Sequence, residues 1–346
     1  MTEFMITLRN ADGSDGVGPP RFLTFDDAAG PERMFDTEEW VLRLIATFPT
    51  AAPSREGDEP PRVGDILFLV HGFNVNHDAA KAFHVKCADA LGAAGWQGQL
   101  VSFDWPSRGL VFAYLDDRSN ARAAASALVT SGISLLEAAQ KQNCTIDTHV
   151  ISHSMGGFVA QQAFTWAYQD VPADWRVGQL IFVAADVDYS VFSAGAVSAN
   201  SFANHAGRLT AYCNKYDKAL LASNAKRLDL APRMGRVGLP QDAPAFMCEV
   251  ECGAVFDKVF PNDLADDLSP VTTHCFYFDQ SEFWRDVVLT LAGGIDRSLI
   301  PTRVADPDTT LANRFILNPA GISATAYRTA LVRSAVSPSI VPPAAP

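Results

Sequence analysis

The feature that most constrains the fold is an alternation of short apolar segments with helix-length segments between residues 63 and 295. The segment Asp65–Val70 reads DILFLV, a continuous apolar run typical of a strand buried on both faces. Further strands are expected at Gln99–Phe103, Ile146–Ile151, Leu180–Ala184 and Leu209–Cys213. Helices are expected after Asp78 as an N-cap, and at Ser119–Lys141, Met155–Tyr168 and Asp279–Ala292. This order predicts an α/β fold, a mostly parallel sheet with helices on both faces.

Two extensions flank this alternating core. Residues 1–62 form an N-terminal extension, with strand-like and helical segments expected to pack on the core at Phe4–Leu8, Arg21–Phe25 and Thr37–Phe48. Residues 63–295 form the predicted catalytic domain, and residues 296–346 form a C-terminal extension. The last stretch of that extension is rich in Pro and Ala, so about ten residues are expected to be unstructured.

The composition excludes several classes of protein. The chain has 346 residues, and 27 Lys and Arg against 39 Asp and Glu give a net charge of −12. A nucleic-acid binder needs a basic surface to neutralise phosphates, so no nucleic-acid partner is expected. No window approaches 18 uninterrupted apolar residues and the N-terminus has no signal-like layout, so no membrane span is expected.

The cysteines favour a reducing compartment. They are scattered without a Cys-x-x-Cys pair, and we expect buried free thiols at Cys87, Cys144, Cys213, Cys248, Cys252 and Cys275. The predicted location is therefore cytoplasmic. No structural zinc site is expected, because the tightest pair, Cys248 and Cys252, lacks further ligands nearby in the sequence. No other metal and no cofactor is expected either. The oligomeric state stays open.

The most informative segment is Ile151–Gly157, which reads ISHSMGG at the junction of a buried strand and a helix. A serine on so abrupt a turn is held in a strained conformation, with its hydroxyl raised above the carboxyl end of the sheet. Small residues are needed two positions before and after it, and Ser152 and Gly156 stand there. Ser154 is therefore the predicted nucleophile.

A second segment, His71–Asn74, follows the DILFLV strand. Acyl transfer needs two backbone N–H groups aimed at the oxyanion of the tetrahedral intermediate. The amide after the nucleophile, that of Met155, is one predicted donor, and the amide of Phe73 is the other. We expect His71 to hold this loop and to take no part as a base.

The serine needs a base, and the base needs an orienting acid. In folds of this kind the chain order is Ser, then Asp or Glu, then His. His274 stands just before the last amphipathic helix and is the predicted base, with His205 as the alternative. Asp217, in the loop after a strand, is the predicted acid, and Asp186 or Asp188 after the preceding strand stays open as a replacement.

Taken together, these segments carry a family resemblance. They occur in one order at His71–Asn74, Phe103–Ser107, Ser152–Gly156, Ala184–Asp188, Tyr212–Leu220 and His274 with Tyr277–Asp279. Over roughly residues 63–295 they resemble a bacterial alpha/beta-hydrolase family of unknown function, related to serine esterases and lipases. The resemblance implies an alpha/beta-hydrolase fold and the triad Ser154, Asp217 and His274. It brings no known substrate.

Aromatic residues after one of the strands are candidates for the substrate pocket. Trp105 at a strand end, with Phe112 and Tyr114 in the following loop, is predicted to line an apolar cleft, which favours neutral acyl or aromatic esters. The segments Val187–His205 and Lys226–Ser269 are long enough to form a lid.

The sequence thus predicts a serine hydrolase that cleaves carboxylic esters through an acyl-enzyme on Ser154. An amidase or peptidase, a thioesterase or a lactonase would use the same triad. A non-catalytic binding or scaffold protein of hydrolase fold is the alternative from another class.

Overall fold

The computed structural model describes the chain in seven ranges, namely residues 2–51, 61–108, 114–136, 144–170, 175–227, 231–261 and 267–336. The chain divides into two compact units. Unit 1 comprises Met1–Asp89 with Gln97–Val177, and unit 2 comprises Ala90–Trp96 with Gly178–Pro346. The stretch of about ten C-terminal residues expected to be unstructured lies outside the described residues, and so does Phe112.

The sheet of unit 1 contains the strands β1 (Glu3–Arg9), β2 (Val17–Phe25), β3 (Arg33–Phe35), β4 (Arg62–Val70), β5 (Gln99–Asp104) and β6 (Cys144–His153). They lie in the order β6-β4-β5-β1-β2-β3. The pairs β6–β4, β4–β5 and β5–β1 are parallel, and the pairs β1–β2 and β2–β3 are antiparallel. The carboxyl ends of four parallel strands therefore share one edge.

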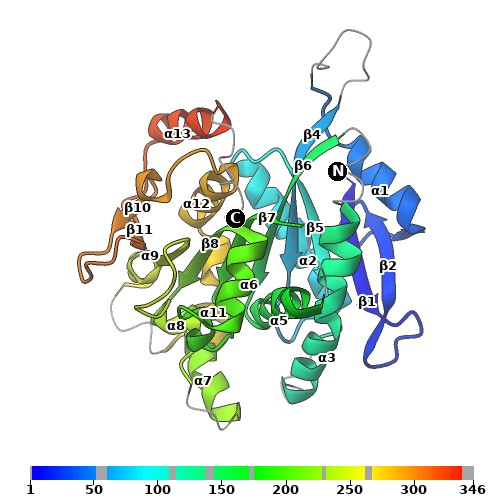
Figure 1. Ribbon diagram of the computed structural model, residues 1–346, viewed down its shortest axis with the longest axis horizontal. Helices are drawn as coiled ribbons and strands as arrows, with labels where there is room; N and C mark the ends of the chain where they lie inside the picture. Colours follow the sequence, from blue (N-terminus) through cyan, green and yellow to red (C-terminus); the bar gives the residue numbers. More distant parts are fainter. Residues whose placement is uncertain are drawn as a thin grey trace. The chain divides into compact units, whose positions relative to one another are not determined.

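The register of these strands fixes what stands at that edge. Val70 of β4 pairs with Ser152 of β6 and with Phe103 of β5, and Thr7 of β1 pairs with Asp104 of β5. The segments that follow β4 and β6 begin with the predicted site residues. The N-terminal segment also contributes to this carboxyl end of the sheet, because β1 pairs directly with β5 (Figure 1).

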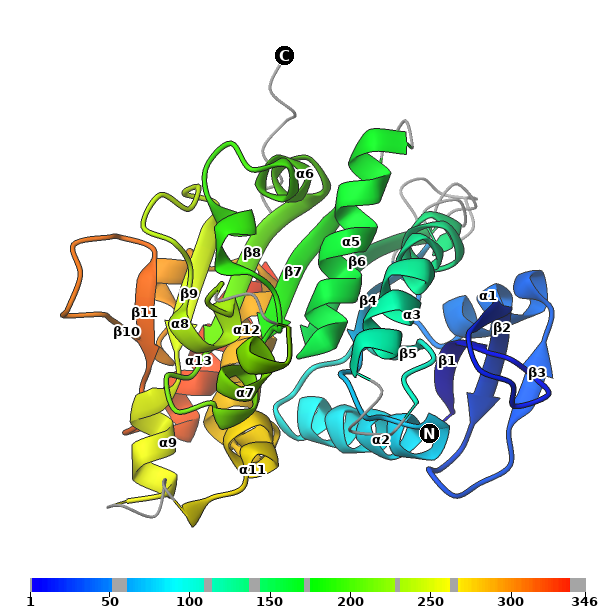
Figure 2. The same ribbon diagram turned by 90° about the horizontal axis from the view of Figure 1, so that it is seen from below.

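The helices of unit 1 cover both faces of its sheet, as the alternating pattern predicted. They are α1 (Thr37–Ala46), α2 (His77–Ala93), α3 (Tyr114–Ala127) and α5 (Met155–Asp170). The helices α3 and α5 pack on each other along one face, and α2 lies on the other (Figure 2). Apolar side chains of β1 and β2, among them Met5 and Phe25, pack against Ala80 of α2. On the opposite face, the indole ring of Trp40 in α1 packs against Phe4 and Phe22.

Two helix boundaries differ from the prediction. Helix α2 is capped by Asn76, whose side-chain oxygen accepts a hydrogen bond from the Ala79 amide at 2.8 Å, so Asp78 lies in the first turn and is not the N-cap. Helix α3 begins at Tyr114 in place of Ser119 and passes into a π-helical turn at Leu128–Ile133. Acidic residues in the first turn of α3 suit the positive end of the helix dipole and allow the earlier start.

The sheet of unit 2 contains the strands β7 (Val177–Val183), β8 (Ala206–Cys213), β9 (Met247–Glu251), β10 (Arg303–Ala305) and β11 (Arg314–Leu317). They lie in the order β10-β11-β9-β8-β7. The pairs β8–β9 and β9–β11 are parallel, and β10–β11 is antiparallel. The sequence predicted β7 and β8 and missed the other three. Since β9 lies within Lys226–Ser269, part of that segment belongs to the sheet.

The helices of unit 2 are α6 (Val197–His205), α7 (Lys218–Arg227), α8 (Met234–Val237), α9 (Gly253–Val259), α11 (Pro270–Cys275), α12 (Ser281–Ala292) and α13 (Ala324–Val336). The predicted late amphipathic helix is α12, and α13 packs beside it through Leu289, Tyr327 and Ala330. Beneath them the guanidinium of Arg303 contacts the Asp286 carboxylate at 2.7 Å, with both side chains buried.

Four of the five cysteines whose side chains are described agree with the prediction of buried free thiols. Cys87, Cys213, Cys248 and Cys252 are buried free thiols, and Cys275 is a half-buried one. The side chain of Cys144 lies outside what the structure describes. Among the described residues, no helix combines the length and the apolar character needed to cross a bilayer.

Candidate active site

Ser154 stands on a strained turn between β6 and α5 in unit 1. Its backbone φ is +57°, in the left-handed region that a residue with a Cβ rarely adopts. Strand β6 ends at His153 and α5 begins at Met155, so the whole reversal is made at this one residue. Its side chain is 8% exposed. The strained strand-to-helix serine that the sequence predicted is therefore present.

The turn is packed against the end of β4. A Cβ on Gly156 would lie 2.3 Å from the Val70 carbonyl oxygen and 2.4 Å from that of His71, so only a glycine allows α5 to begin this close to the sheet. The first N–H groups of a helix have no intrahelical acceptor. The amide of Met155, the first residue of α5, belongs to this set and is the predicted oxyanion donor.

The segment after β4 passes directly beside Ser154. A Cβ on Gly72 would meet the Ser154 Cβ at 2.8 Å, so the backbone before Phe73 approaches the predicted nucleophile closely. Asn74 has a φ of +61°, a second left-handed residue within this short loop. The predicted donors Phe73 and Met155 thus belong to two backbone segments that meet at Ser154.

His71 holds this loop, as expected. Its Nε2 lies 3.0 Å from the Asp104 carboxylate, and its Nδ1 lies 2.9 Å from the Gly72 carbonyl oxygen. Its ring stacks on the indole of Trp105 at 5.4 Å between centroids. The indole N–H of Trp105 donates to the His71 carbonyl oxygen at 2.8 Å.

Two of the predicted pocket residues are described. Trp105 is fully buried beneath the loop of residues 71–76, where its indole N–H supports the backbone. Tyr114 begins α3, and its ring packs edge-on against that of Phe73 at 5.5 Å. Contact of either ring with a substrate remains a prediction.

His274 and Asp217 are brought together in unit 2. Asp217 lies in the turn between β8 and α7, and His274 lies in the short helix α11, whose N-cap is Ser269. The His274 Nδ1 is 2.6 Å from the Asp217 Oδ2, and the Asp217 carboxylate is fully buried. A carboxylate only accepts, so Nδ1 carries the proton and Nε2 is the ring nitrogen suited to act as a base.

The surroundings of His274 favour its cationic form. Burial by itself would lower the pKa of the imidazole, but the charge of Asp217, the hydrogen bond to it and the charge of Asp186 together raise the pKa above its ordinary value. An imidazole that is stabilised when protonated is suited to accept a proton from a hydroxyl and to return it to a leaving group.

The alternative residues have other partners or positions. Asp186 accepts a hydrogen bond from the Ser223 hydroxyl at 3.0 Å and lies 3.4 Å from the Arg233 guanidinium. Asp188 accepts from the Ser190 amide at 2.9 Å and caps a short 3₁₀ turn. His205 ends α6, directly before β8. The roles of Asp217 as the acid and of His274 as the base remain predictions.

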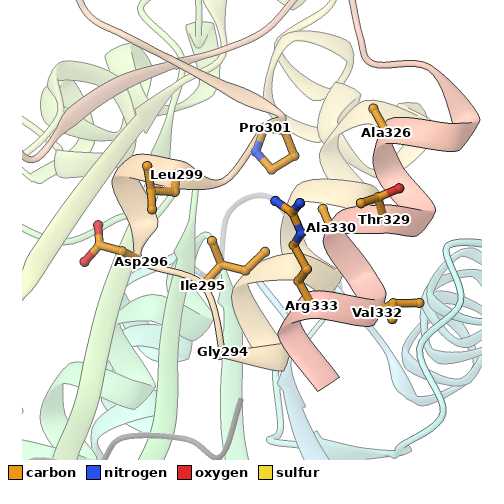
Figure 3. Close-up of a pocket in the computed structure, with 10 residues that line it drawn as sticks. All are labelled: Gly294, Ile295, Asp296, Leu299, Pro301, Ala326, Thr329, Ala330, Val332 and Arg333. Atoms are coloured by element: carbon orange, nitrogen blue, oxygen red, sulfur yellow. The ribbon is translucent and has the colours of Figure 1, made fainter. Parts of the chain in front are cut away.

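A hollow of about 760 Å³ lies elsewhere in unit 2, beside α13 and the 3₁₀ turn Arg297–Leu299 (Figure 3). It is lined by Gly294, Ile295, Asp296, Leu299, Pro301, Ala326, Thr329, Ala330, Val332 and Arg333. None of the predicted site residues is among them. Within the described ranges, no group of three or more His, Cys, Asp and Glu side chains is arranged to hold a metal ion.

Comparison with known proteins identifies the family. The model of a family described as alpha/beta hydrolase of unknown function matches residues 59–249, more than half of the chain. The chain belongs to this family. The mostly parallel sheets and their flanking helices agree with the alpha/beta-hydrolase fold that this membership implies.

Solved structures similar to this alpha/beta hydrolase include an inhibited esterase B from Lactobacillus rhamnosis, at 11% identity, covering 84% of this chain and 86% of that one with a TM-score of 0.39. An esterase from Pyrobaculum calidifontis is 13% identical and covers 62% of this chain and 80% of that one, with a TM-score of 0.31. Likenesses this weak carry no argument about substrate. A search of curated proteins found no relative of the chain.

Proposed function

We propose that this alpha/beta hydrolase cleaves carboxylic esters through an acyl-enzyme on Ser154. The observation that carries the proposal is the left-handed backbone at Ser154, because such a residue costs about 1–3 kcal/mol and strained residues of this kind cluster at active sites. The bond between Asp217 and His274 supports it, since an oriented imidazole is the partner that a serine nucleophile requires.

In the proposed reaction the Ser154 hydroxyl oxygen attacks the ester carbonyl carbon while His274 Nε2 takes the hydroxyl proton. Asp217 holds the imidazole in the required tautomer and stabilises its cation. The carbonyl oxygen becomes an oxyanion, which the Phe73 and Met155 amides bind. The carbon–oxygen bond to the alcohol then breaks, and the alcohol leaves with the proton from His274.

Water completes the cycle. His274 takes a proton from the water molecule as its oxygen attacks the acyl carbon, and the bond to Ser154 breaks as that proton returns to the serine oxygen. The products are one carboxylic acid and one alcohol, and the enzyme is restored. Amide, thioester and lactone substrates would follow the same steps, so the choice of ester is tested by experiment.

The test is a panel of esters, thioesters and amides with matched acyl groups, run on the wild type, on Ser154→Ala and on Ser281→Ala. Loss of the nucleophile is expected to lower kcat by about 10⁶-fold. Ser281 is exposed at the start of α12, so its variant controls for the substitution itself. A fluorophosphonate probe should label the wild type at Ser154.

Two results would refute the proposal. A kcat of Ser154→Ala close to that of the wild type would exclude the acyl-enzyme, and a wild type without activity or labelling would favour the non-catalytic alternative. A faster reaction with thioesters or amides than with matched esters would move the assignment to that class.

A further inference from the structure

A buried polar cluster lies beneath the His71 loop, defined as residues 71–76. At its centre is the carboxylate of Asp104, fully buried at the end of β5. It accepts hydrogen bonds from four side chains, those of Thr7 at 2.8 Å, Arg9 at 2.9 Å, His71 at 3.0 Å and His77 at 2.6 Å. Burial would raise the pKa of Asp104, but the hydrogen bonds from His71 and His77 and the charge of Arg9 hold it well below its usual range.

Arg9 joins the two loops that follow β4 and β5. Its Nε bonds Asp104, its Nη1 donates to the Ser107 carbonyl oxygen at 2.8 Å, and its Nη2 donates to the Val75 carbonyl oxygen at 2.8 Å. These are the fixed fork directions of a guanidinium, which a lysine ammonium cannot reproduce. Arg9 lies at the end of β1, outside the family-matched residues 59–249.

His77 ties the same carboxylate to a second one. Its Nδ1 is 2.6 Å from Asp104 and its Nε2 is 2.6 Å from Glu32. Both acceptors are carboxylates, so both ring nitrogens must carry protons for the two bonds to form. Lys81 of α2 pairs with the same Glu32 carboxylate at 3.2 Å.

These contacts fix the His71 loop on both sides of Phe73. Before Phe73, His71 is bonded through its ring to Asp104 and through its carbonyl oxygen to Trp105. After it, the Val75 carbonyl oxygen is bonded to Arg9. Between them stand Gly72, packed on Ser154, and the left-handed Asn74.

We propose that Arg9 and His77 are positioning residues that act through Asp104 and the His71 loop to aim the Phe73 amide at the oxyanion. The inference rests on the proposed function. It assigns a role to the N-terminal segment, which supplies Thr7, Arg9 and Glu32 to the cluster. A donor misplaced by about 1 Å costs on the order of 100-fold in rate, so the support of the loop matters as much as the donor itself.

The experiment measures kcat and KM for ester hydrolysis in the full-length Arg9→Lys and His77→Gln variants, together with their thermal unfolding. His84→Gln is the matched control, because His84 is a buried histidine of the same helix whose two ring nitrogens contact Glu3 at 2.9 Å and Ser102 at 2.7 Å, in place of Glu32 and Asp104. Arg9→Lys keeps the positive charge and loses the fixed N–H directions of the guanidinium.

Since an oxyanion bond forms only in the transition state, kcat should fall at least about tenfold in Arg9→Lys and in His77→Gln while KM stays within about threefold. His84→Gln should keep the wild-type kcat even where its melting temperature falls as far. If one test variant fails to fold, the other decides.

Unchanged kcat in a folded test variant, or an equal loss of kcat in His84→Gln, would overturn the assignment while leaving the proposed function intact. A kcat of Ser154→Ala close to that of the wild type, or a wild type that neither hydrolyses esters nor is labelled, would instead remove the proposed function and this assignment with it.

Discussion

The close approach of α5 to β4 predicts that Gly156→Ala disables the enzyme. The added methyl carbon would lie 2.3 Å from the Val70 carbonyl oxygen and 2.4 Å from the His71 carbonyl oxygen. Both are backbone atoms of the end of β4 and the start of the His71 loop, so neither can move aside by changing a rotamer.

The size of the effect follows from this geometry. Carbon and carbonyl oxygen atoms normally approach to about 3.3 Å, so the first turn of α5 must move by roughly 1 Å from the end of β4. Overpacking of this kind costs about 1–3 kcal/mol of stability. The same movement carries Ser154 and the Met155 amide with it, and a shift of about 1 Å lowers the rate on the order of 100-fold.

The assay is kcat/KM for the best ester of the panel, together with thermal unfolding, for Gly156→Ala and Gly92→Ala. Gly92 lies in the last turn of α2, and a Cβ there meets nothing within 4 Å. The Gly92→Ala control should keep its activity, and its free energy of unfolding should rise by about 0.5–1 kcal/mol, because alanine is more stable than glycine inside a helix. A Gly156→Ala variant with the melting temperature and kcat/KM of the wild type would refute the packing argument.

Three further predictions follow from the charged groups. Because a base must be neutral, kcat should rise with pH through the raised pKa of His274. Asp217→Asn should lower kcat by about 10⁴-fold and move this rise in kcat to lower pH, whereas Asp186→Asn should shift the rise less and keep most of the activity. The pH–rate profiles of the wild type and the two variants test this. Because the pKa of Asp104 is lowered, its carboxylate stabilises the fold above the unfolded-state pKa of about 3.9, and this stability is lost as the pH falls. Because the pKa of His77 is raised, its imidazole stabilises the fold below the unfolded-state pKa of about 6.5, and this stability is lost as the pH rises. Above about pH 6.5 the melting temperature of His77→Gln should therefore depend less on pH than that of the wild type, and an unchanged dependence would contradict the His77 bridge between Asp104 and Glu32. Asp286→Ala leaves the buried Arg303 without its carboxylate partner and should lower the free energy of unfolding by about 3–5 kcal/mol. Glu39→Ala, in the exposed pair with Arg43, should lower it by less than about 1 kcal/mol. Equal losses for the two variants in urea titrations would show that burial does not set the cost.

The long apolar strands were predictable because burial on both faces of a parallel sheet leaves a continuous apolar run, as in β4 and β7. The short strands β9, β10 and β11 were not, since they have three to five residues, too few for a pattern to stand out from a buried loop.

In the candidate site, too, local features could be predicted and the pairing of distant residues could only be ranked. Ser154 could be found because a strand-to-helix serine needs small neighbours at fixed spacing, and that requirement is local. The pairing of Asp217 with His274 followed from chain order, which ranked the candidates without excluding Asp186 or His205.

The sequence by itself determined the long buried strands, the turn that carries Ser154 and a short set of side chains able to act as a base and an acid. Tertiary structure alone decided that Arg9 meets Asp104, 95 residues later, and that His77 bridges it to Glu32. The physical reason is that periodicity specifies the faces of a strand but not its neighbours. The insertion of β1 beside β5 is a property of the whole sheet, and it is what brings these charges together.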